Sequence, residues 1–173
     1  MKAAPRGREE PIRYDVIPTP FGRGIAAVRR GRLVLLRWAT GPEALAEFGA
    51  ALRDPGALRP FRRKIARYFA GERVDLGPLE LPGSTPFARR VYGAVSRIPY
   101  GEVRTYGEIA DAAGKPGAAR AVGMLMSKNP LCLGVPCHRV VAAGGKLGGF
   151  TGGVERKKRL LELEAAASGF MGR

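Results

Sequence analysis

The chain has 173 residues, enough for one ordinary domain or two small ones. Its 30 Lys and Arg residues exceed its 15 Asp and Glu residues, giving a formal net charge of +15. This excess points to a polyanionic partner, with nucleic acid as the first candidate and a solubilising basic surface as the alternative. No apolar run approaches the roughly 18 residues of a membrane span, and no apolar segment follows the first residues, so we expect a cytoplasmic protein with no membrane contact.

The first half of the chain predicts a small α/β domain after a tail. Residues 1–11 show no periodicity and predict a disordered tail. We expect a strand at 12–18 and a hairpin of 24–27 with 33–38, in which Gly31 takes a positive φ. Apolar spacing then predicts helices at 42–52 and 60–69, and the Pro- and Gly-containing segment 74–83 reads as a connector. The domain boundary is placed there, which gives a tail of 1–11, an N-terminal domain of 12–82 and a C-terminal domain of 83–173.

Helix signals dominate the start of the second half. A helix at 86–97 has Ser84 or Thr85 as its cap. Glu108 follows Thr105 at the capping-box spacing, and Gly114 supplies the stop of that second helix. A third helix at 118–128 follows a tight turn, so the pair is a helix-turn-helix candidate, although many core helix pairs share this pattern.

The third helix has two distinct faces. Its apolar face carries Ala118, Val122, Leu125 and Met126, and its other face carries Arg120, Gly123, Met124 and Ser127, with Lys128 beside them. A glycine on an exposed helix face costs about 1 kcal/mol relative to alanine, but it permits close approach of a partner. We interpret this face as a DNA-contacting surface, with a plain solvent face as the alternative.

Both cysteines and the only histidine lie in the stretch 129–141. Pro136 fixes its own φ and restricts Val135, so the thiol of Cys137 leaves a rigid corner beside the imidazole of His138. This arrangement is typical of an activated sulfur nucleophile, and the alternative is a buried Cys beside a core His. Two Cys and one His cannot supply a four-ligand zinc site from these types alone, so we expect no metal and no other cofactor. A disulfide between Cys132 and Cys137 is conceivable, but a cytoplasmic setting favours free thiols.

The C-terminal segment predicts a partner for that histidine. Gly144-Gly145 predicts a hairpin of 140–143 with 146–150, and a last helix spans 154–167. Glu164 falls between Leu160 and Leu161 on the apolar stripe, where a carboxylate is costly unless it is paired. A bond from Glu164 to His138 would orient the ring, favour its cationic form and complete a Cys–His–Glu relay. The alternative is a frayed helix end with Glu164 in water.

With these residues assembled, the chain resembles the O6-alkylguanine-DNA alkyltransferases, also called methylated-DNA–protein-cysteine methyltransferases. The matching pieces lie in family order and spacing across about residues 85–165, whereas 12–82 match only loosely, mainly in Tyr68-Phe69-Ala70-Gly71. The pieces are Ile98-Pro99-Tyr100-Gly101-Glu102, Thr105-Tyr106-Gly107-Glu108-Ile109-Ala110, Arg120-Ala121-Val122-Gly123, Asn129-Pro130, Pro136-Cys137-His138-Arg139-Val140, and Gly152-Gly153 with Lys157, Leu160-Leu161 and Glu164.

The resemblance implies an α+β fold, with a small variable N-terminal domain holding a sheet and a mostly helical C-terminal domain holding the helix-turn-helix and the reactive cysteine. It implies a monomer that acts once on double-stranded DNA containing O6-alkylguanine, and O4-alkylthymine as a further possible substrate. Cys137 is then the alkyl acceptor, His138 its base through a water, Glu164 the support of His138, and Asn129 the brace of the turn.

The resemblance also implies the substrate contacts. Tyr106 bonds to the guanine, Val140 contacts its edge through the backbone, and the region of Thr151 closes over O6. Phe150 stands where relatives often carry Tyr, which removes a hydroxyl near the pocket. Arg120 enters the duplex in place of the extruded nucleotide, and the expected DNA-contacting residues are Arg120, Ala121, Gly123, Met124, Ser127 and Lys128.

Three other functions compete with this interpretation. A non-catalytic alkyltransferase-like protein would recognise the damaged base without chemistry, but such relatives lack the cysteine that Cys137 supplies here. A helix-turn-helix regulator would bind one DNA sequence regardless of alkylation. A cysteine hydrolase would need an oxyanion hole, for which the sequence shows no feature, and would turn over repeatedly.

Cys132 is expected to be a buried structural thiol.

Overall fold

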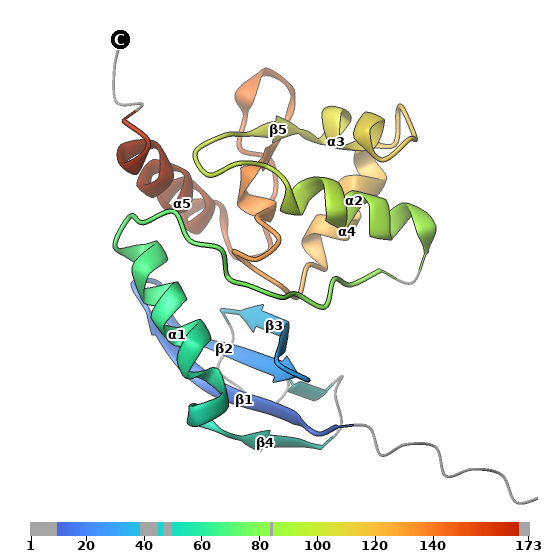
Figure 1. Cartoon of the computed structure of the whole chain (residues 1–173). Helices are drawn as coiled ribbons and strands as arrows, with labels where there is room; N and C mark the ends of the chain where they lie inside the picture. The colour runs from blue at the N-terminus through green and yellow to red at the C-terminus, as the bar shows by residue number, and fades with distance from the viewer. Residues whose placement is uncertain (1–9, 39–44, 47–49, 84, 170–173) are drawn as a thin grey trace, which may run out of the picture.

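The computed structural model describes residues 10–38, 45–46, 50–83 and 85–169. Among these residues, a sheet and the helix α1 form the N-terminal part, and a group of helices forms the C-terminal part, with the connector running between them (Figure 1). Within the described residues, no helix is both long and apolar enough to cross a membrane. The predicted α+β class is confirmed; the expected disordered tail lies, up to residue 9, outside the described residues.

The N-terminal sheet has four strands in the order β3-β2-β1-β4. Both β1–β2 and β2–β3 pair antiparallel, whereas β4 pairs parallel to β1. The hairpin between β2 and β3 turns at Arg30 and Gly31, with φ of 51° and 70°, which is the two-residue turn that matches strand twist. The predicted hairpin and the positive φ of Gly31 are therefore confirmed. The strands are β1 (Ile12–Thr19), β2 (Gly22–Arg29), β3 (Arg32–Arg37) and β4 (Ala51–Arg53).

Two helix predictions in this part need correction. The end of the helix expected at 42–52 is wrong because Ala51–Arg53 forms β4, whose pairing with β1 outweighs local helix propensity. Most of that expected helix lies outside the described residues. The helix expected at 60–69 is longer: α1 (Pro55–Phe69) begins where Asp54 accepts a hydrogen bond from the amide of Ala57 at 3.0 Å, and Pro60 lies inside it.

The C-terminal helices follow their local signals. Thr85 caps α2 (Pro86–Ser96) by accepting from the amide of Ala88. The capping box of Thr105 and Glu108 is complete at the start of α3 (Tyr106–Ala112), and Gly114 ends that helix with a φ of 71°. Helix α4 (Ala119–Ser127) packs against α3, and both contact α2, so the predicted helix-turn-helix pair is present. The chain closes with α5 (Val154–Ala167), within the predicted bounds.

The hairpin expected around Gly144-Gly145 is wrong. β6 (Val140–Val141) pairs in parallel with β5 (Arg104–Thr105), and the glycines lie in a 3-10 turn, η3 (Ala143–Gly145). One backbone bond from Ala142 to Lys146, at 2.8 Å, closes the turn, but no strand follows it. Strand β6 thus pairs with β5, next to the helix-turn-helix, and not with the segment 146–153. Residues of that segment form one wall of a cleft instead.

The open edge of the sheet is covered by the turn that carries the cysteines. Leu36 of β3 accepts from the amide of Cys132 at 2.9 Å and donates to the carbonyl of Pro130 at 2.7 Å. The connector covers the other end of the same strand through Leu33. Apolar residues of both parts form one continuous core, from Ile17 and Leu58 to Val91 and Leu160. The sheet therefore supports the reactive turn directly, and its edge is protected from further pairing.

Candidate active site

Asn129 organises the turn before Cys137. Its side-chain nitrogen donates to the carbonyl of Val135 at 2.8 Å, and its side-chain oxygen accepts from the amide of Leu131 at 3.0 Å. Pro136 then starts a short 3-10 helix, η2 (Cys137–Arg139). Both polar ends of the buried Asn129 are satisfied within the turn, so they fix the backbone that leads into Cys137.

The last helix brings a carboxylate to the histidine. Glu164 lies on the third turn of α5, and its Oε1 is 2.8 Å from Nε2 of His138. Both side chains are almost fully buried, with exposed fractions of 0% and 1%. The predicted contact between His138 and Glu164 is confirmed, and the alternative of a frayed end with Glu164 in water is excluded.

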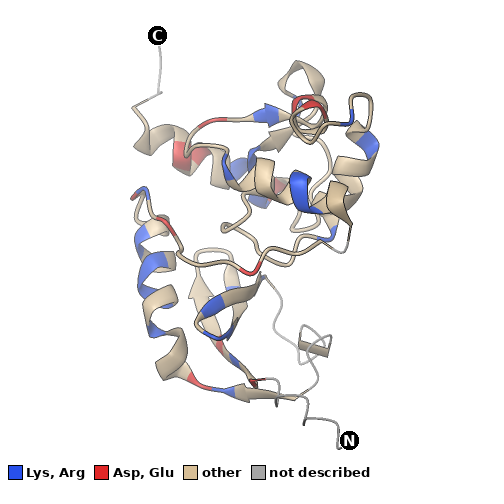
Figure 2. Cartoon of the chain, turned by 45° about the vertical axis from the view of Figure 1, so that its right-hand side comes forward, with Lys and Arg blue, Asp and Glu red and all other residues tan. Residues whose placement is uncertain are grey.

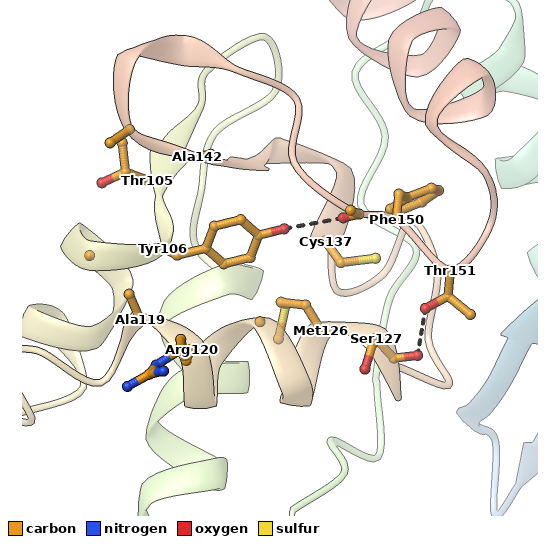
Figure 3. Close-up of a pocket in the computed structure, with 14 residues that line it drawn as sticks. Thr105, Tyr106, Ala119, Arg120, Met126, Ser127, Cys137, Ala142, Phe150 and Thr151 are labelled. Atoms are coloured by element: carbon orange, nitrogen blue, oxygen red, sulfur yellow. Dashed lines mark hydrogen bonds between the residues drawn. The ribbon is translucent and has the colours of Figure 1, made fainter.

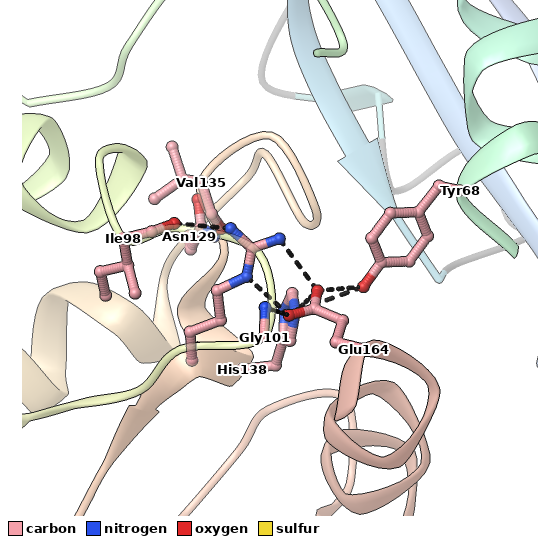
Figure 4. A network of polar contacts seen from close by, with 8 residues as sticks. Tyr68, Ile98, Gly101, Asn129, Val135, His138 and Glu164 are labelled. Atoms are coloured by element: carbon pink, nitrogen blue, oxygen red, sulfur yellow. Dashed lines mark hydrogen bonds and ion pairs between the residues drawn. The ribbon is translucent and has the colours of Figure 1, made fainter. Parts of the chain in front are cut away.

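Glu164 holds more partners than the sequence analysis expected. It accepts two hydrogen bonds from Arg139, both at 2.9 Å, one from the hydroxyl of Tyr68 at 2.6 Å and one from the amide of Gly101 at 3.1 Å (Figure 4). Arg139 also donates to the carbonyl of Ile98 at 2.7 Å. With the bond from His138, the carboxylate accepts five hydrogen bonds, so its negative charge is fully solvated by protein groups.

The charge states of this network differ from one expectation. Burial opposes ionisation of Glu164, but the bonds from His138 and Arg139 lower its pKa to about 2. Burial lowers the pKa of His138, and the positive charges of Arg139 and Lys157 lower it further against the pull of Glu164. Glu164 does favour the cationic imidazole, as expected, but the larger effect of burial outweighs it, so the neutral ring is the stable form near neutral pH. A neutral ring that donates from Nε2 keeps Nδ1 as a proton acceptor.

Lys157 is a buried cation beside the thiol. Its ammonium donates to the carbonyl of Val140 at 2.6 Å and to that of Leu147, and its exposed fraction is 0%. Burial lowers the pKa of Lys157 to about 8, against the opposing effect of Cys137. Two carbonyl dipoles hold this ammonium, and the thiolate of Cys137 is the negative group that acts on its charge.

The two thiols are neighbours. A hydrogen bond from Cys132 lowers the pKa of Cys137 against burial, with further help from Asn129 and Lys157. The same contact raises the pKa of Cys132, so Cys132 keeps its proton and Cys137 is the one that ionises. Both cysteines are free, as expected, but Cys132 is only partly buried. It lines a cavity of about 430 Å³ together with Cys137 and Trp38, so its burial is less complete than expected.

Cys137 also lines a larger cleft of about 790 Å³, which adjoins that cavity (Figure 3). The hydroxyl of Tyr106 donates to the carbonyl of Gly149 at 3.3 Å, and that of Thr151 donates to the carbonyl of Ser127 at 2.7 Å. These bonds join the loop before α5 to the helices opposite. Seven predicted site residues line the cleft, namely Tyr106, Arg120, Gly123, Ser127, Cys137, Phe150 and Thr151.

Other predicted residues lie around the cleft rather than in it. Val140 is buried, Asn129 lies behind the turn, and Ala121 is half-buried on α4. Met124 and Lys128 are exposed beyond the cleft, and the exposed fraction of Met124 is 63%. Met126 is predicted from the sequence to lie on the core face only, yet it also lines the cleft, together with Thr105, Gly107 and Ala119.

The outer face of α4 forms the rim of this cleft. Arg120 is exposed there and lies beside the Tyr106 side of the hollow (Figure 3). A Cβ added to Gly123 would meet only the ring of Tyr106, at 3.9 Å, which is ordinary contact. Packing within the chain therefore does not require glycine at this position. Lys and Arg also outnumber acidic residues across both parts of the molecule (Figure 2).

Three residues of the polar network had no assigned role in the sequence analysis, namely Tyr68, Arg139 and Lys157. Each stood inside a segment that matched the family pattern, which was the only available signal. In the described part of the chain, no cluster of three or more His, Cys, Asp or Glu side chains is placed to hold a metal ion.

Comparisons with known proteins identify the family. The family described as "6-O-methylguanine DNA methyltransferase, DNA binding domain" matches residues 86–166. The methylated-DNA–protein-cysteine methyltransferase of Mycolicibacterium paratuberculosis is 44% identical over 154 residues, which cover 88% of this chain and 92% of that protein. That of Mycobacterium tuberculosis is 54% identical over 112 residues, covering 64% of this chain and 67% of that protein.

Solved structures give the same result for the fold. The crystal structure of Mycobacterium tuberculosis OGT in complex with DNA matches with a TM-score of 0.81 and 44% identity, covering 90% of this chain and 94% of that chain. The O6-methylguanine-DNA methyltransferase of Pyrococcus kodakaraensis matches with a TM-score of 0.61 and 28% identity, covering 88% and 98%. The chain belongs to the 6-O-methylguanine DNA methyltransferase family.

Proposed function

We propose that this protein repairs DNA by direct reversal, moving the alkyl group from O6 of guanine to the sulfur of Cys137. The observation that carries the proposal is the position of Cys137, which has the buried His138–Glu164 pair on one side and the cleft rimmed by Arg120 on the other. A thiolate near pH 7 requires a lowered pKa, and the contacts to Cys137 act in that direction.

The proposed reaction is a single displacement. His138 takes the thiol proton through a bridging water, and the Cys137 thiolate attacks the alkyl carbon, so a C–S bond forms as the O6–C bond breaks. The electron pair stays on the guanine, where a bond from Tyr106 helps to neutralise it. Glu164 holds His138 in orientation, and Asn129 holds the turn. The product is a thioether, which no described residue is placed to displace, so each molecule acts once.

The same geometry supports a role for the cleft in base flipping. A stacked guanine cannot present O6 to a protein sulfur, so the nucleotide must leave the helix, at a cost of a few kcal/mol. We assign Arg120 to the space that the nucleotide leaves, and Val140, Phe150 and Thr151 to the pocket for the base. The outer face of α4 would meet the duplex through Ala121, Gly123, Met124, Ser127 and Lys128. Phosphate contacts from the basic surface carry no sequence preference, which suits a lesion that arises anywhere.

Three further assignments belong to the proposal. All residues assigned to the reaction come from one chain, so a monomer suffices. The two free cysteines favour a reducing compartment, which supports a cytoplasmic location. We keep the domain boundary at residues 82 and 83, where the connector meets α2, and add that the two domains share a core. The alternative of a non-catalytic damage-recognition protein does not fit a chain that retains Cys137 among relatives named as methyltransferases.

The test uses duplex DNA carrying one O6-methylguanine. After incubation, intact mass spectrometry and peptide mapping should show one added methyl group per protein, on Cys137. The variant Cys137→Ala should gain none, and Cys132→Ala reports whether the neighbouring thiol is ever the acceptor. More than one methyl removed from DNA per protein molecule would contradict the single-use mechanism, and a methyl group found elsewhere would contradict the role of Cys137.

A further inference from the structure

The N-terminal part of the molecule contributes one side chain to the network behind the reactive cysteine. Tyr68 lies near the end of α1, and its hydroxyl donates to Oε1 of Glu164 at 2.6 Å. The same hydroxyl is 3.3 Å from Nε2 of His138, which shares that carboxylate oxygen at 2.8 Å. Three polar atoms, from α1, η2 and α5, thus meet at one point (Figure 4).

The surroundings of this hydroxyl leave it little freedom. Tyr68 has an exposed fraction of 3%, and its ring packs edge-on against Phe69 at 5.3 Å and Tyr100 at 5.8 Å. Burial raises the pKa of Tyr68 strongly, with a further rise from the nearby Glu164 charge, so the phenol stays protonated. It is therefore a neutral donor to Glu164 around neutral pH.

A neutral donor has an effect that a second cation would not have. Arg139 already balances the charge of Glu164, and a further positive group would weaken the hold of Glu164 on a proton-accepting His138. The Tyr68 hydroxyl instead withdraws electron density from the one oxygen that His138 uses, without adding charge. It therefore limits how strongly Glu164 raises the basicity of the imidazole, and it fixes the direction in which the carboxylate faces the ring.

We propose that Tyr68 is a positioning residue for the Cys137–His138–Glu164 relay. Through this hydroxyl, the N-terminal domain adjusts the basicity of His138 and hence the rate of alkyl transfer. The proposal rests on the proposed function, because it assigns Tyr68 to the relay of that same reaction. It also gives the variable first domain a defined task in the chemistry, in addition to supporting the turn through Leu36.

The expected pH dependence of methyl transfer involves the charged and titratable groups around His138 and Glu164. Without the Tyr68 donor, Glu164 interacts more strongly with His138, so the neutral imidazole becomes scarcer below neutrality and the rate loss should grow as pH falls. At high pH the thiol ionises without help, and the loss should shrink. The groups around His138 and Glu164 are Tyr68 from α1, Cys137 and Arg139 from η2, Lys157 from α5 and Tyr100 from the turn before β5. Arg73, which precedes the connector, lies over the Tyr100 ring.

The matched pair of variants is Tyr68→Phe and Tyr100→Phe. Each removes one buried hydroxyl from the same aromatic cluster, but the hydroxyl of Tyr100 has no hydrogen-bond partner among the described residues. The measurement is the single-turnover rate of methyl transfer from duplex DNA between pH 5 and pH 9, with DNA affinity and thermal unfolding recorded for each variant.

The expected result for Tyr68→Phe is transfer about three- to tenfold slower at pH 7, the size expected for losing one ordinary hydrogen bond. The loss should be larger at pH 5.5, should approach none at pH 9, and should leave DNA affinity unchanged, whereas Tyr100→Phe should match the wild type throughout. A rate equal to wild type, or one lowered by the same factor at every pH, would overturn the proposal. If the wild type itself transfers no methyl group, the proposed function fails instead.

A second measurement does not depend on the rate. His138 is the only histidine of the chain, so its imidazole gives one set of ring signals in an NMR pH titration. The midpoint should move to higher pH in Tyr68→Phe and stay in place in Tyr100→Phe. An unchanged midpoint in Tyr68→Phe would also count against the proposal.

Discussion

On its buried side, η2 presents His138 and Arg139 to a carboxylate that already accepts five hydrogen bonds. On its cleft side, the same short helix presents Cys137 to an open hollow of about 790 Å³. The buried side is complete without a substrate, whereas the rim of the cleft carries the exposed Arg120, and Met124 is exposed beyond it. The chemistry is thus organised before DNA arrives, and the recognition surface is completed only by DNA.

This contrast sets the order of the expected effects. Damage to the buried side should harm stability and transfer together, since its groups are charged, desolvated and mutually dependent. Damage to the cleft side should harm transfer from duplex DNA while leaving the folded protein intact.

The largest effect is expected from Glu164→Gln. The amide keeps the shape of the side chain but removes its charge, so Arg139 becomes a buried cation without a counter-charge. Removing one partner of a buried pair costs about 3–5 kcal/mol of the free energy of unfolding. We also expect methyl transfer to slow by about 100-fold, because the base His138 loses its support. Urea unfolding and single-turnover rates measure the two losses.

Glu162→Gln is the matched control on the same helix. Glu162 is exposed and pairs with Lys158 at 3.8 Å on the surface, an interaction worth no more than about 1 kcal/mol. If both variants lose the same stability, or if Glu164→Gln transfers methyl groups at the wild-type rate, the buried network does not have the importance assigned to it.

The next effect is acid destabilisation through the same carboxylate. The pKa of Glu164 is about 2 in the folded protein, below the ordinary value of 4.5. A group whose folded pKa is depressed stabilises the protein above its unfolded pKa, and this contribution is lost as pH falls through the folded pKa. The window is therefore about pH 4.5 down to about pH 2, with a loss on the order of 3 kcal/mol.

The wild type and Glu164→Gln together isolate this contribution. Other carboxylates, such as those of Asp54 and Glu108, titrate in both proteins. The difference in unfolding free energy between the two proteins should therefore narrow steadily below pH 4.5. A difference that stays constant down to pH 2 would show that Glu164 does not titrate in this window.

The sequence predicted best where local rules decide the structure. The capping box of Thr105 and Glu108, the turn at Gly31 and the bounds of α5 each depend on residues a few positions apart. The pairing of Glu164 with His138 was also predictable, because a carboxylate on an apolar stripe needs a partner and the chain has one histidine.

Prediction from the sequence failed where contacts between distant segments decide the structure. Ala51–Arg53 becomes a strand through pairing with β1, and Val140–Val141 through pairing with β5. Within the site, Tyr68 is 96 residues from Glu164, and no local pattern joins them. The neutral state of His138 was not predicted for a related reason: the burial of its ring, which lowers its pKa, and the two hydrogen bonds from Arg139 to Glu164 are properties of the fold.

The smallest and most selective effect is expected from a substitution on the cleft side of η2, Arg120→Ala. In Arg120→Ala the buried network is untouched, so stability and the reactivity of Cys137 should be unchanged. Transfer from duplex DNA should slow by about 10- to 100-fold, because the unstacking cost of a few kcal/mol is no longer offset by an inserted side chain. Reaction with the free base O6-benzylguanine needs no flipping and should stay within about twofold of wild type by the same argument.

Arg59→Ala removes the same charge from the exposed surface of α1 and serves as the control for a general loss of attraction to DNA. If Arg59→Ala slows duplex repair as much as Arg120→Ala, only net charge is at work. If Arg120→Ala slows both substrates equally, Arg120 acts on the pocket rather than on the duplex. A loss on duplex DNA alone would show that the two functions are separate. The reactivity of Cys137 would remain intact, and only the extrusion of the nucleotide from the DNA duplex would be impaired.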